Sequence, residues 1–258
     1  MKISEGPNAS TLLRTGCIAV VTAWFGLLAL LVSVFESSGR RQHRIARSWA
    51  STILQIIRCP ITVIGAEHLP TRPSRKWGQK VPRPAPAVYA CNHLSYFDTP
   101  ALFASLRFQF RILAKSGLFK IPFLGWYLRR SGQVPVELGN THASLRSLNA
   151  GVKTLKHGLP LVIFPEGGRS PDGQLHTFLS GMAYMAVRAQ VPIVPMALVG
   201  TYGTLPIHVY NIRPRPFLLI VGEPISTADY SIRQLDQLTT RVFQAISQLY
   251  TEHAPAAS

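Results

Sequence analysis

The sequence predicts an α/β protein in which helices flank a central mixed β-sheet, preceded by an N-terminal membrane-anchoring helix or helical hairpin. Three observations lead to this expectation. A long uncharged run lies near the N-terminus, short apolar runs that end in polar loops recur after it, and apolar residues at helical spacing separate those runs. Buried strands that alternate with helices are typical of α/β layering.

The uncharged run at residues 15–35 predicts a membrane segment. As a helix rising ~1.5 Å per residue it would span ~31 Å, about one bilayer hydrocarbon core. A cleaved signal peptide is the competing interpretation, but the run is longer than a signal-peptide core and no small-x-small cleavage site precedes Glu36. We therefore favour an anchor that the protein retains.

Charge around the anchor predicts its orientation. Four arginines lie between residues 40 and 47, whereas Lys2 and Arg14 precede the run, so the positive-inside bias places the following domain in the cytoplasm. A second interpretation keeps the segment in one leaflet, because residues 44–57 could form an interfacial helix and complete a hairpin. We expect an anchor at residues 1–57 and a globular domain at residues 58–258.

Composition narrows the partners. The chain has 27 Lys and Arg against 11 Asp and Glu, which predicts attraction to anions such as phospholipid headgroups or nucleic acid. The cations are scattered rather than interleaved with aromatics in one motif, so anionic lipid explains them better than nucleic acid. Cys17, Cys59 and Cys91 are unrelated singles, which indicates a reduced compartment and argues against structural zinc.

The elements after the anchor follow from apolar runs and turn residues. Residues 59–70 predict a short strand and turn, and the basic, proline-rich residues 71–86 predict a loop. Residues 87–90 and 159–173 each predict a buried strand that ends in a polar loop.

Helices and further strands complete the pattern. A helix is expected from a cap at Asn140 or Thr141 to Gly158, through Leu145, Leu148, Val152 and Leu155. Residues 191–200 and 216–225 predict two more strands. A closing amphipathic helix passes through Leu235, Leu238, Val242, Ile246 and Leu249.

The stretch CNHLSYFD at residues 91–98 places His93 five positions before Asp98. Within one helix the two would point about 140° apart, but they can meet if His93 follows a strand and Asp98 opens the next helix. Asp98 would then fix the imidazole tautomer, so that the other ring nitrogen accepts a proton from a hydroxyl. The alternative is that Asp98 or Thr99 caps the helix and His93 is a satisfied polar residue.

The stretch FPEGGRS at residues 164–170 predicts an anion site. Its glycines let backbone N–H groups approach an anion, and Arg169 can grip a phosphate with its forked guanidinium. Ordinary turn chemistry is the alternative for this stretch alone.

NHLSYFD, FPEGGRS and VPIVPMA, in this order and at this spacing, resemble blocks of the glycerolipid acyltransferase family, most closely its 1-acylglycerol-3-phosphate acyltransferases. The resemblance covers about residues 60–225 together with the hydrophobic N-terminal anchor. It implies that His93 and Asp98 form the catalytic His-x4-Asp pair. It also implies a substrate-binding block made of Glu166, Gly167, Gly168 and Arg169.

Three positions depart from the family pattern. Gly168 stands where the family usually has threonine, Leu138 stands where its glycerol-phosphate block ends in arginine, and Leu179 stands where it often has lysine. Either the acceptor headgroup differs or other cations compensate for the two that are missing. The candidates for compensation are Lys115, Lys120, Arg129 and Arg130.

The resemblance implies a membrane enzyme of phospholipid biosynthesis, with its catalytic domain on the cytoplasmic face. It would transfer a fatty acyl group from acyl-CoA or acyl carrier protein to the free hydroxyl of a lysophospholipid, chiefly 1-acylglycerol-3-phosphate, giving phosphatidate. No cofactor, metal or nucleic acid is expected. Another lyso-lipid acceptor, or an inactive lipid-binding membrane protein, remains the alternative, whereas the GxSxG and HExxH motifs of serine and zinc hydrolases are absent from the sequence.

Overall fold

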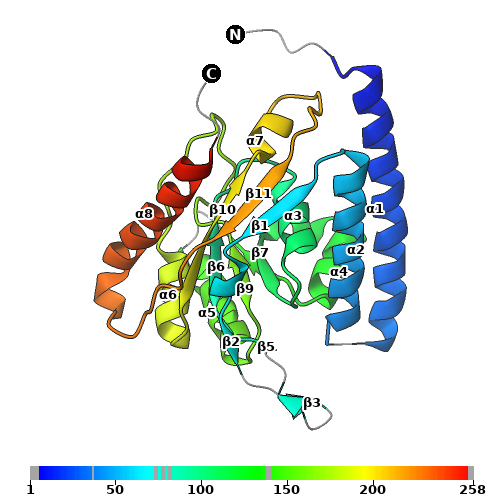
Figure 1. The fold of residues 1–258 in the computed structure, drawn as a ribbon. Helices are drawn as coiled ribbons and strands as arrows, with labels where there is room; N and C mark the ends of the chain where they lie inside the picture. The colour runs from blue at the N-terminus through cyan, green and yellow to red at the C-terminus, as the bar shows by residue number, and fades with distance from the viewer. Residues whose placement is uncertain are drawn as a thin grey trace.

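A computed structural model of the chain describes residues 6–36, 38–72, 75–76, 79–80, 83–137 and 141–254. A seven-stranded sheet lies between two layers of helices, with a pair of long helices along one flank (Figure 1). The predicted fold class, a mixed sheet flanked by helices with an apolar helix before it, is confirmed.

Six strand pairings give the strand order of the seven-stranded sheet. Its order is β1-β11-β10-β6-β9-β7-β8, and every neighbouring pair is parallel except β10 with β11, which is antiparallel. The strands are β1 (Ile61–Ile64), β6 (Val88–Cys91), β7 (Arg111–Lys115), β8 (Val134–Val136), β9 (Leu161–Ile163), β10 (Ile193–Val199) and β11 (Phe217–Val221). Because β6 and β9 are adjacent and parallel, the loops that follow them meet at the same edge of the sheet.

Both faces of the sheet are covered. Along β6, Tyr89 and Cys91 pack on one side with α2 and α3, whereas Val88 and Ala90 pack on the other with α5, α6 and α8. This explains why residues 87–90 read as a continuous apolar run rather than an alternating one. The covering helices are α2 (Arg40–Ile56), α3 (Asp98–Ser105), α5 (Thr141–Lys156), α6 (Gly181–Ala189) and α8 (Leu235–His253).

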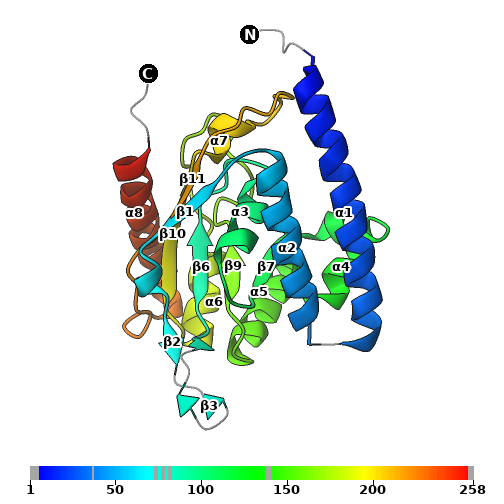
Figure 2. The same ribbon diagram turned by 45° about the vertical axis from the view of Figure 1, so that its right-hand side comes forward.

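The N-terminal helices form the predicted hairpin. α1 (Ala9–Phe35) has a mean hydropathy of 2.5 over its most apolar window, with 17% of that window buried, and it is the candidate membrane span among the described residues. α2 packs along α1, and the Trp49 indole N–H donates to Thr22 Oγ1 at 3.0 Å (Figures 1 and 2). The opposite face of α2 belongs to the core beneath the sheet, through Ala46, Ala50, Ile53 and Leu54.

Both ends of α1 are tied to the globular part. At its beginning, the Asn8 backbone N–H donates to Asn211 Oδ1 at 2.8 Å, and the Ile212 N–H donates to Thr11 Oγ1 at 3.1 Å. Beyond its other end, Arg111 Nη2 donates to the Ser38 carbonyl at 3.0 Å. α1 therefore lies along the flank of the domain over its whole length.

The expected strands and helices are found, with one correction. The proline-rich residues 71–86 were expected to be a loop, but β2 (Thr71–Arg72) pairs with β5 (Arg83–Pro84), and β3 (Arg75–Lys76) pairs with β4 (Gln79–Lys80). Two-residue strands are too short to leave a periodicity of two in the sequence. Leu138 and Asn140 lie outside the described residues.

Several elements were not predicted. β7 and β8 complete the sheet, and α6 covers it. The short elements are η1 (Ala66–His68), η2 (Ser116–Lys120), α4 (Leu124–Arg130), α7 (Thr201–Thr204) and η3 (Ile232–Gln234).

Candidate active site

The loop between β6 and α3 brings His93 and Asp98 together. His93 Nδ1 lies 2.7 Å from Asp98 Oδ2, and Asp98 is fully buried at the first residue of α3. The same oxygen accepts the backbone N–H groups of Leu94 at 2.6 Å and Ser95 at 2.7 Å. These donors precede α3, so the carboxylate closes the loop back on itself instead of capping its helix.

Neighbouring side chains fix this loop to the sheet. Asn92 makes two hydrogen bonds to Leu198 of β10, accepting its N–H at 2.7 Å and donating to its carbonyl at 2.9 Å. The Ser95 hydroxyl donates to the Leu205 carbonyl at 2.9 Å. The backbone on both sides of His93 is therefore held by side-chain hydrogen bonds.

The His93 ring is also held from its flat side. It stacks on Phe164, with ring centroids 4.0 Å apart and an interplanar angle of 13°. With Nδ1–H donated to Asp98, the lone pair of Nε2 is available to accept a proton. The arrangement suits a general base, because orientation and tautomer are both set before a substrate arrives.

Glu166 joins the two loops that follow β6 and β9. One of its carboxylate oxygens accepts the His93 backbone N–H at 2.8 Å, and the other accepts the His176 N–H at 3.1 Å. The Ser170 N–H in turn donates to the His93 carbonyl at 2.8 Å. Burial raises the pKa of Glu166, although the two backbone donors oppose this shift.

Arg169 lies on an aromatic ring rather than in an ion pair. The guanidinium carbon is 3.5 Å from the centre of the Tyr96 ring. Its Nη1 is buried and, within the described part of the chain, has no hydrogen-bond partner. Gly167 adopts a left-handed backbone (φ 72°), and Gly168 is exposed with open space where a β-carbon would stand. An unsatisfied guanidinium beside an open glycine backbone suits an anionic ligand.

The two loops open into one large cavity. It measures about 1500 Å³ and is lined mainly by apolar side chains of α1, α2, β7 and the η2–α4 segment. His93, Tyr96 and Arg169 line it as well. Leu179, at the position where the family often has lysine, lines the cavity, and so does Lys115 among the four cations expected to compensate.

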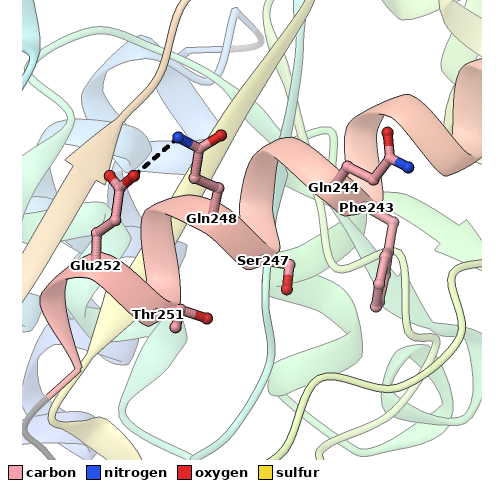
Figure 3. Close-up of a pocket in the computed structure, with 6 residues that line it drawn as sticks. All are labelled: Phe243, Gln244, Ser247, Gln248, Thr251 and Glu252. Carbon is pink, nitrogen blue, oxygen red and sulfur yellow. Dashed lines mark hydrogen bonds between the residues drawn. The ribbon is translucent and has the colours of Figure 1, made fainter.

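A second depression of about 420 Å³ does not resemble a site. Its lining residues all come from one face of α8, and Gln248 donates to Glu252 at 2.8 Å along the helix surface (Figure 3). No groups from different elements converge there among the lining residues shown. We therefore treat this face of α8 as ordinary polar surface.

Sequence reasoning missed a small network behind the glycine loop. Asp172 Oδ1 accepts the Gln174 N–H at 3.0 Å and the Ser170 hydroxyl at 2.9 Å, and it lies 3.0 Å from His176 Nε2. These partners, the Gln174 N–H first, lower the pKa of Asp172 to about 2. A short run of Ser, Asp and Gly after the strand was the available signal, because such residues favour side-chain-closed turns.

Metal-binding residues do not gather in the described ranges, where no group of three or more His, Cys, Asp or Glu side chains could hold an ion. Cys17, Cys59 and Cys91 are free thiols in the structure. Cys91 is fully buried at the end of β6, and burial raises the pKa of its thiol. A buried neutral thiol is a poor nucleophile, so Cys91 is not a candidate for nucleophilic catalysis.

The chain is similar to known acyltransferases. The family described as Acyltransferase matches residues 60–199, more than half of the chain. A chloroplastic 1-acyl-sn-glycerol-3-phosphate acyltransferase of Arabidopsis thaliana is 31% identical over 195 residues, which are 73% of this chain and 51% of that relative. A 1-acyl-sn-glycerol-3-phosphate acyltransferase of Chlamydomonas reinhardtii is 30% identical over 256 residues, covering 94% of this chain and 72% of the relative.

A solved structure shares the fold. The 1-acyl-sn-glycerophosphate acyltransferase PlsC from Thermotoga maritima superposes with a TM-score of 0.75 at 23% identity, over 94% of each chain. The chain spans about half the length of the Arabidopsis relative. The family match contains both β6 and β9 and the loops that follow them. The expected resemblance is confirmed, and the chain belongs to the acyltransferase family.

Proposed function

We propose that the chain transfers a fatty acyl group from a thioester, acyl-CoA or acyl carrier protein, to the free hydroxyl of 1-acylglycerol-3-phosphate, giving phosphatidate. The observation that carries the proposal is the His93–Asp98 pair, oriented at the wall of a large apolar cavity beside Arg169. The names of the Arabidopsis and Chlamydomonas relatives support the choice of acceptor.

In this mechanism His93 is the general base. Its Nε2 takes the proton of the acceptor hydroxyl while the hydroxyl oxygen attacks the thioester carbonyl carbon. Asp98 stabilises the imidazolium that forms. When the tetrahedral intermediate collapses, the C–S bond breaks and the leaving thiolate takes the proton from His93. The product ester and the free thiol leave the histidine neutral again.

The block after β9 would bind the acceptor. Arg169 grips the acceptor phosphate, and the exposed backbone of Gly167 and Gly168 lets that phosphate approach closely. Glu166 does not contact the acceptor in this proposal. Its two carboxylate oxygens accept backbone N–H groups, and one of these belongs to His93. It couples the position of the base to the position of the phosphate site.

The membrane placement is part of the proposal, with residues 1–57 as anchor and 58–258 as catalytic domain. α1, at ~1.5 Å per residue, is about 40 Å long. A helix that crossed the bilayer would have its ends on opposite sides, yet the residues next to both ends of α1, Asn8 and Ser38, are hydrogen-bonded to the same domain. We therefore place α1 within one leaflet. We place it on the cytoplasmic face, because free cysteines persist in the reducing cytoplasm and soluble thioester donors are found there.

Tags at the two termini test this placement. Protease added to intact cells should leave both an N-terminal and a C-terminal tag uncut, and both should become accessible after lysis. A cut N-terminal tag beside a protected C-terminal tag would mean that α1 spans the bilayer. A cut C-terminal tag would overturn the cytoplasmic assignment.

A panel of substrates tests the reaction. Labelled acyl-CoA and acyl carrier protein are offered in turn with lysophospholipids that differ in headgroup, and the products are identified. We expect acylated 1-acylglycerol-3-phosphate. Faster transfer to another lysophospholipid would support the second candidate, which rests on Leu179 lining the cavity where the family often has a cation. No transfer to any acceptor by folded protein would leave an inactive lipid-binding protein.

A further inference from the structure

The η2–α4 segment carries exposed apolar side chains, and three of them, Leu118, Phe123 and Leu124, also line the large cavity. Phe123 is 75% exposed and Trp126 is 43% exposed, whereas the neighbouring Phe119 is buried. The exposed apolar residues of this segment are Leu118, Ile121, Phe123, Leu124 and Trp126. A contiguous exposed apolar surface of this kind marks a contact with a partner or a membrane.

The segment is built to hold these side chains outward. Phe123 has a left-handed backbone (φ 61°), which is uncommon and costly for a bulky residue. A β-carbon at position 125 would collide with the Phe119 carbonyl, so Gly125 allows the close turn. Arg129 Nη1 donates to the same carbonyl at 2.6 Å. A strained but well-bonded turn that exposes an aromatic ring indicates that the exposure is used.

The charged side chains along residues 99–136 are all positive, between Asp98 and Glu137. Residues 99–136 contain six Lys or Arg and no Asp or Glu. Lys115, Lys120, Arg129 and Arg130 are exposed beside the apolar residues. Apolar side chains bordered by cations are typical of surfaces that rest on an anionic bilayer.

The segment continues the surface of α1. α4 contacts α1, and the two lie side by side in the ribbon (Figure 2). Leu27 and Leu31 of α1 are exposed like the side chains of η2–α4. The large cavity is lined by residues of both elements, among them Leu27 and Leu30 of α1 and Phe123 and Leu124 of the η2–α4 segment.

We propose that residues 118–126 form a second membrane-contact surface, which enters the headgroup boundary of the same leaflet as α1 while the adjacent cations bind anionic headgroups. The inference rests on the membrane placement of α1 proposed above, but not on which lysolipid is acylated.

An acidic carrier protein could also be drawn to these cations. The membrane is favoured because the centre of the surface is apolar and aromatic and continues α1, whereas an acidic protein would need mainly the cations. Contact with a membrane and contact with a carrier protein would change the emission of Trp126 in different experiments.

Tryptophan quenching by brominated lipid tests the surface. The full chain is reconstituted in phosphatidylcholine–phosphatidylglycerol vesicles with bromine on the acyl chains. One protein keeps only Trp126, through Trp24→Phe, Trp49→Phe and Trp77→Phe. A reference keeps only Trp24, which is 64% exposed on α1. We expect brominated lipid to quench Trp126 emission to an extent comparable with Trp24.

A matched control lies on the far side of the sheet. With all four native tryptophans replaced by Phe, Gln244→Trp places the fluorophore on the exposed face of α8 (Figure 3). Its emission should not change with bromination. Phe123→Asp in the protein that keeps Trp126 should reduce quenching, because it puts a charge where an apolar ring meets the lipid.

Three results would overturn the proposal. If Trp24 is quenched and Trp126 is not, the η2–α4 segment stays in water while α1 enters the membrane. If neither is quenched, the placement of α1 fails and this surface fails with it. If Trp126 emission responds to an acidic acyl carrier protein but not to brominated lipid, the surface docks the donor. None of these results depends on acyl transfer, so the proposed enzymatic activity is tested separately by the substrate panel.

Discussion

The loops after β6 and β9 begin side by side but are built differently. The loop after β6 is fixed from every side: Asp98 Oδ2 accepts three N–H donors, Asn92 is bonded twice to Leu198, and His93 is stacked on Phe164. The loop after β9 contains two exposed glycines and Arg169, whose Nη1 is unpaired within the described residues.

Under the proposed mechanism, the two loops have different roles. A proton-transfer group must be preoriented, since its rate advantage depends on geometry at the reacting atoms. A phosphate-binding group can complete its hydrogen bonds when the ligand arrives. Substitutions in the first loop should therefore lower kcat, whereas substitutions in the second should mainly raise the KM of the acceptor.

The largest effect should come from the fixed loop. His93→Ala should lower kcat by roughly 10²-fold or more, the usual contribution of a positioned general base. The acceptor KM should change little, and the far-ultraviolet circular dichroism should match the parent protein. Near-normal turnover by the folded variant would remove His93 from the mechanism. The loop after β6 would then have no special role in proton transfer.

Arg169→Ala should produce the next largest effect, and of the opposite kind. Loss of a charge-assisted hydrogen bond costs roughly 1.5–3 kcal/mol, hence about a 10- to 150-fold drop in kcat/KM. We expect the upper half of that range, because leucine stands at position 138 where the family has a second cation. Steady-state kinetics should show a raised KM for the lysolipid and an almost unchanged KM for the thioester. An equal rise for both would take Arg169 out of the headgroup site.

A smaller effect is expected at Tyr96, where the two loops touch. The ring supports the Arg169 guanidinium from 3.5 Å. An exposed cation–π contact contributes roughly 0.5–1 kcal/mol, so Tyr96→Leu should raise the acceptor KM about 2- to 5-fold, and Tyr96→Phe should have little effect. In an Arg169→Ala background the Tyr96→Leu effect should vanish. An effect that persisted there would show that Tyr96 acts on the site by another route.

The smallest effect separates the two glycines. Gly168→Thr, which restores the residue usual in the family, meets open space and should leave the melting temperature close to that of the parent. Gly167→Ala forces a left-handed backbone (φ 72°) on alanine and should cost about 1 kcal/mol of stability. Thermal denaturation of both variants measures the difference. A large penalty for Gly168→Thr would mean that this loop is less open than its geometry indicates.

Much of the sheet could be predicted because buried parallel strands leave continuous apolar runs, as at residues 87–90 and 191–200. β7 was missed because Arg111 and Lys115 at its two ends leave an apolar run of only three residues, and β8 because Pro135 lies at its centre. Pro135 is tolerated there because β8 is an edge strand that pairs with β7 alone within the sheet described. Local pattern finds the middle of such a sheet more readily than its edges.

In the site, the sequence predicts partners that lie close along the chain and misses those that tertiary structure brings together. The meeting of His93 and Asp98 follows from their spacing and from a helix that begins at Asp98. The stacking of His93 on Phe164, and the bond from its backbone to Glu166, join residues about seventy positions apart. No periodicity or turn signal encodes such contacts.

The pairing of β1 with β11 has a consequence for biosynthesis. β1 ends at Ile64, yet its parallel partner begins at Phe217. At 5–20 residues per second, a ribosome needs about 8–30 s to make the intervening chain. During that time α1 and α2 have already emerged, while the core that covers the inner face of α2 is unfinished. The bilayer is the nearest apolar phase, so we expect the nascent protein to be at the membrane before its sheet is complete.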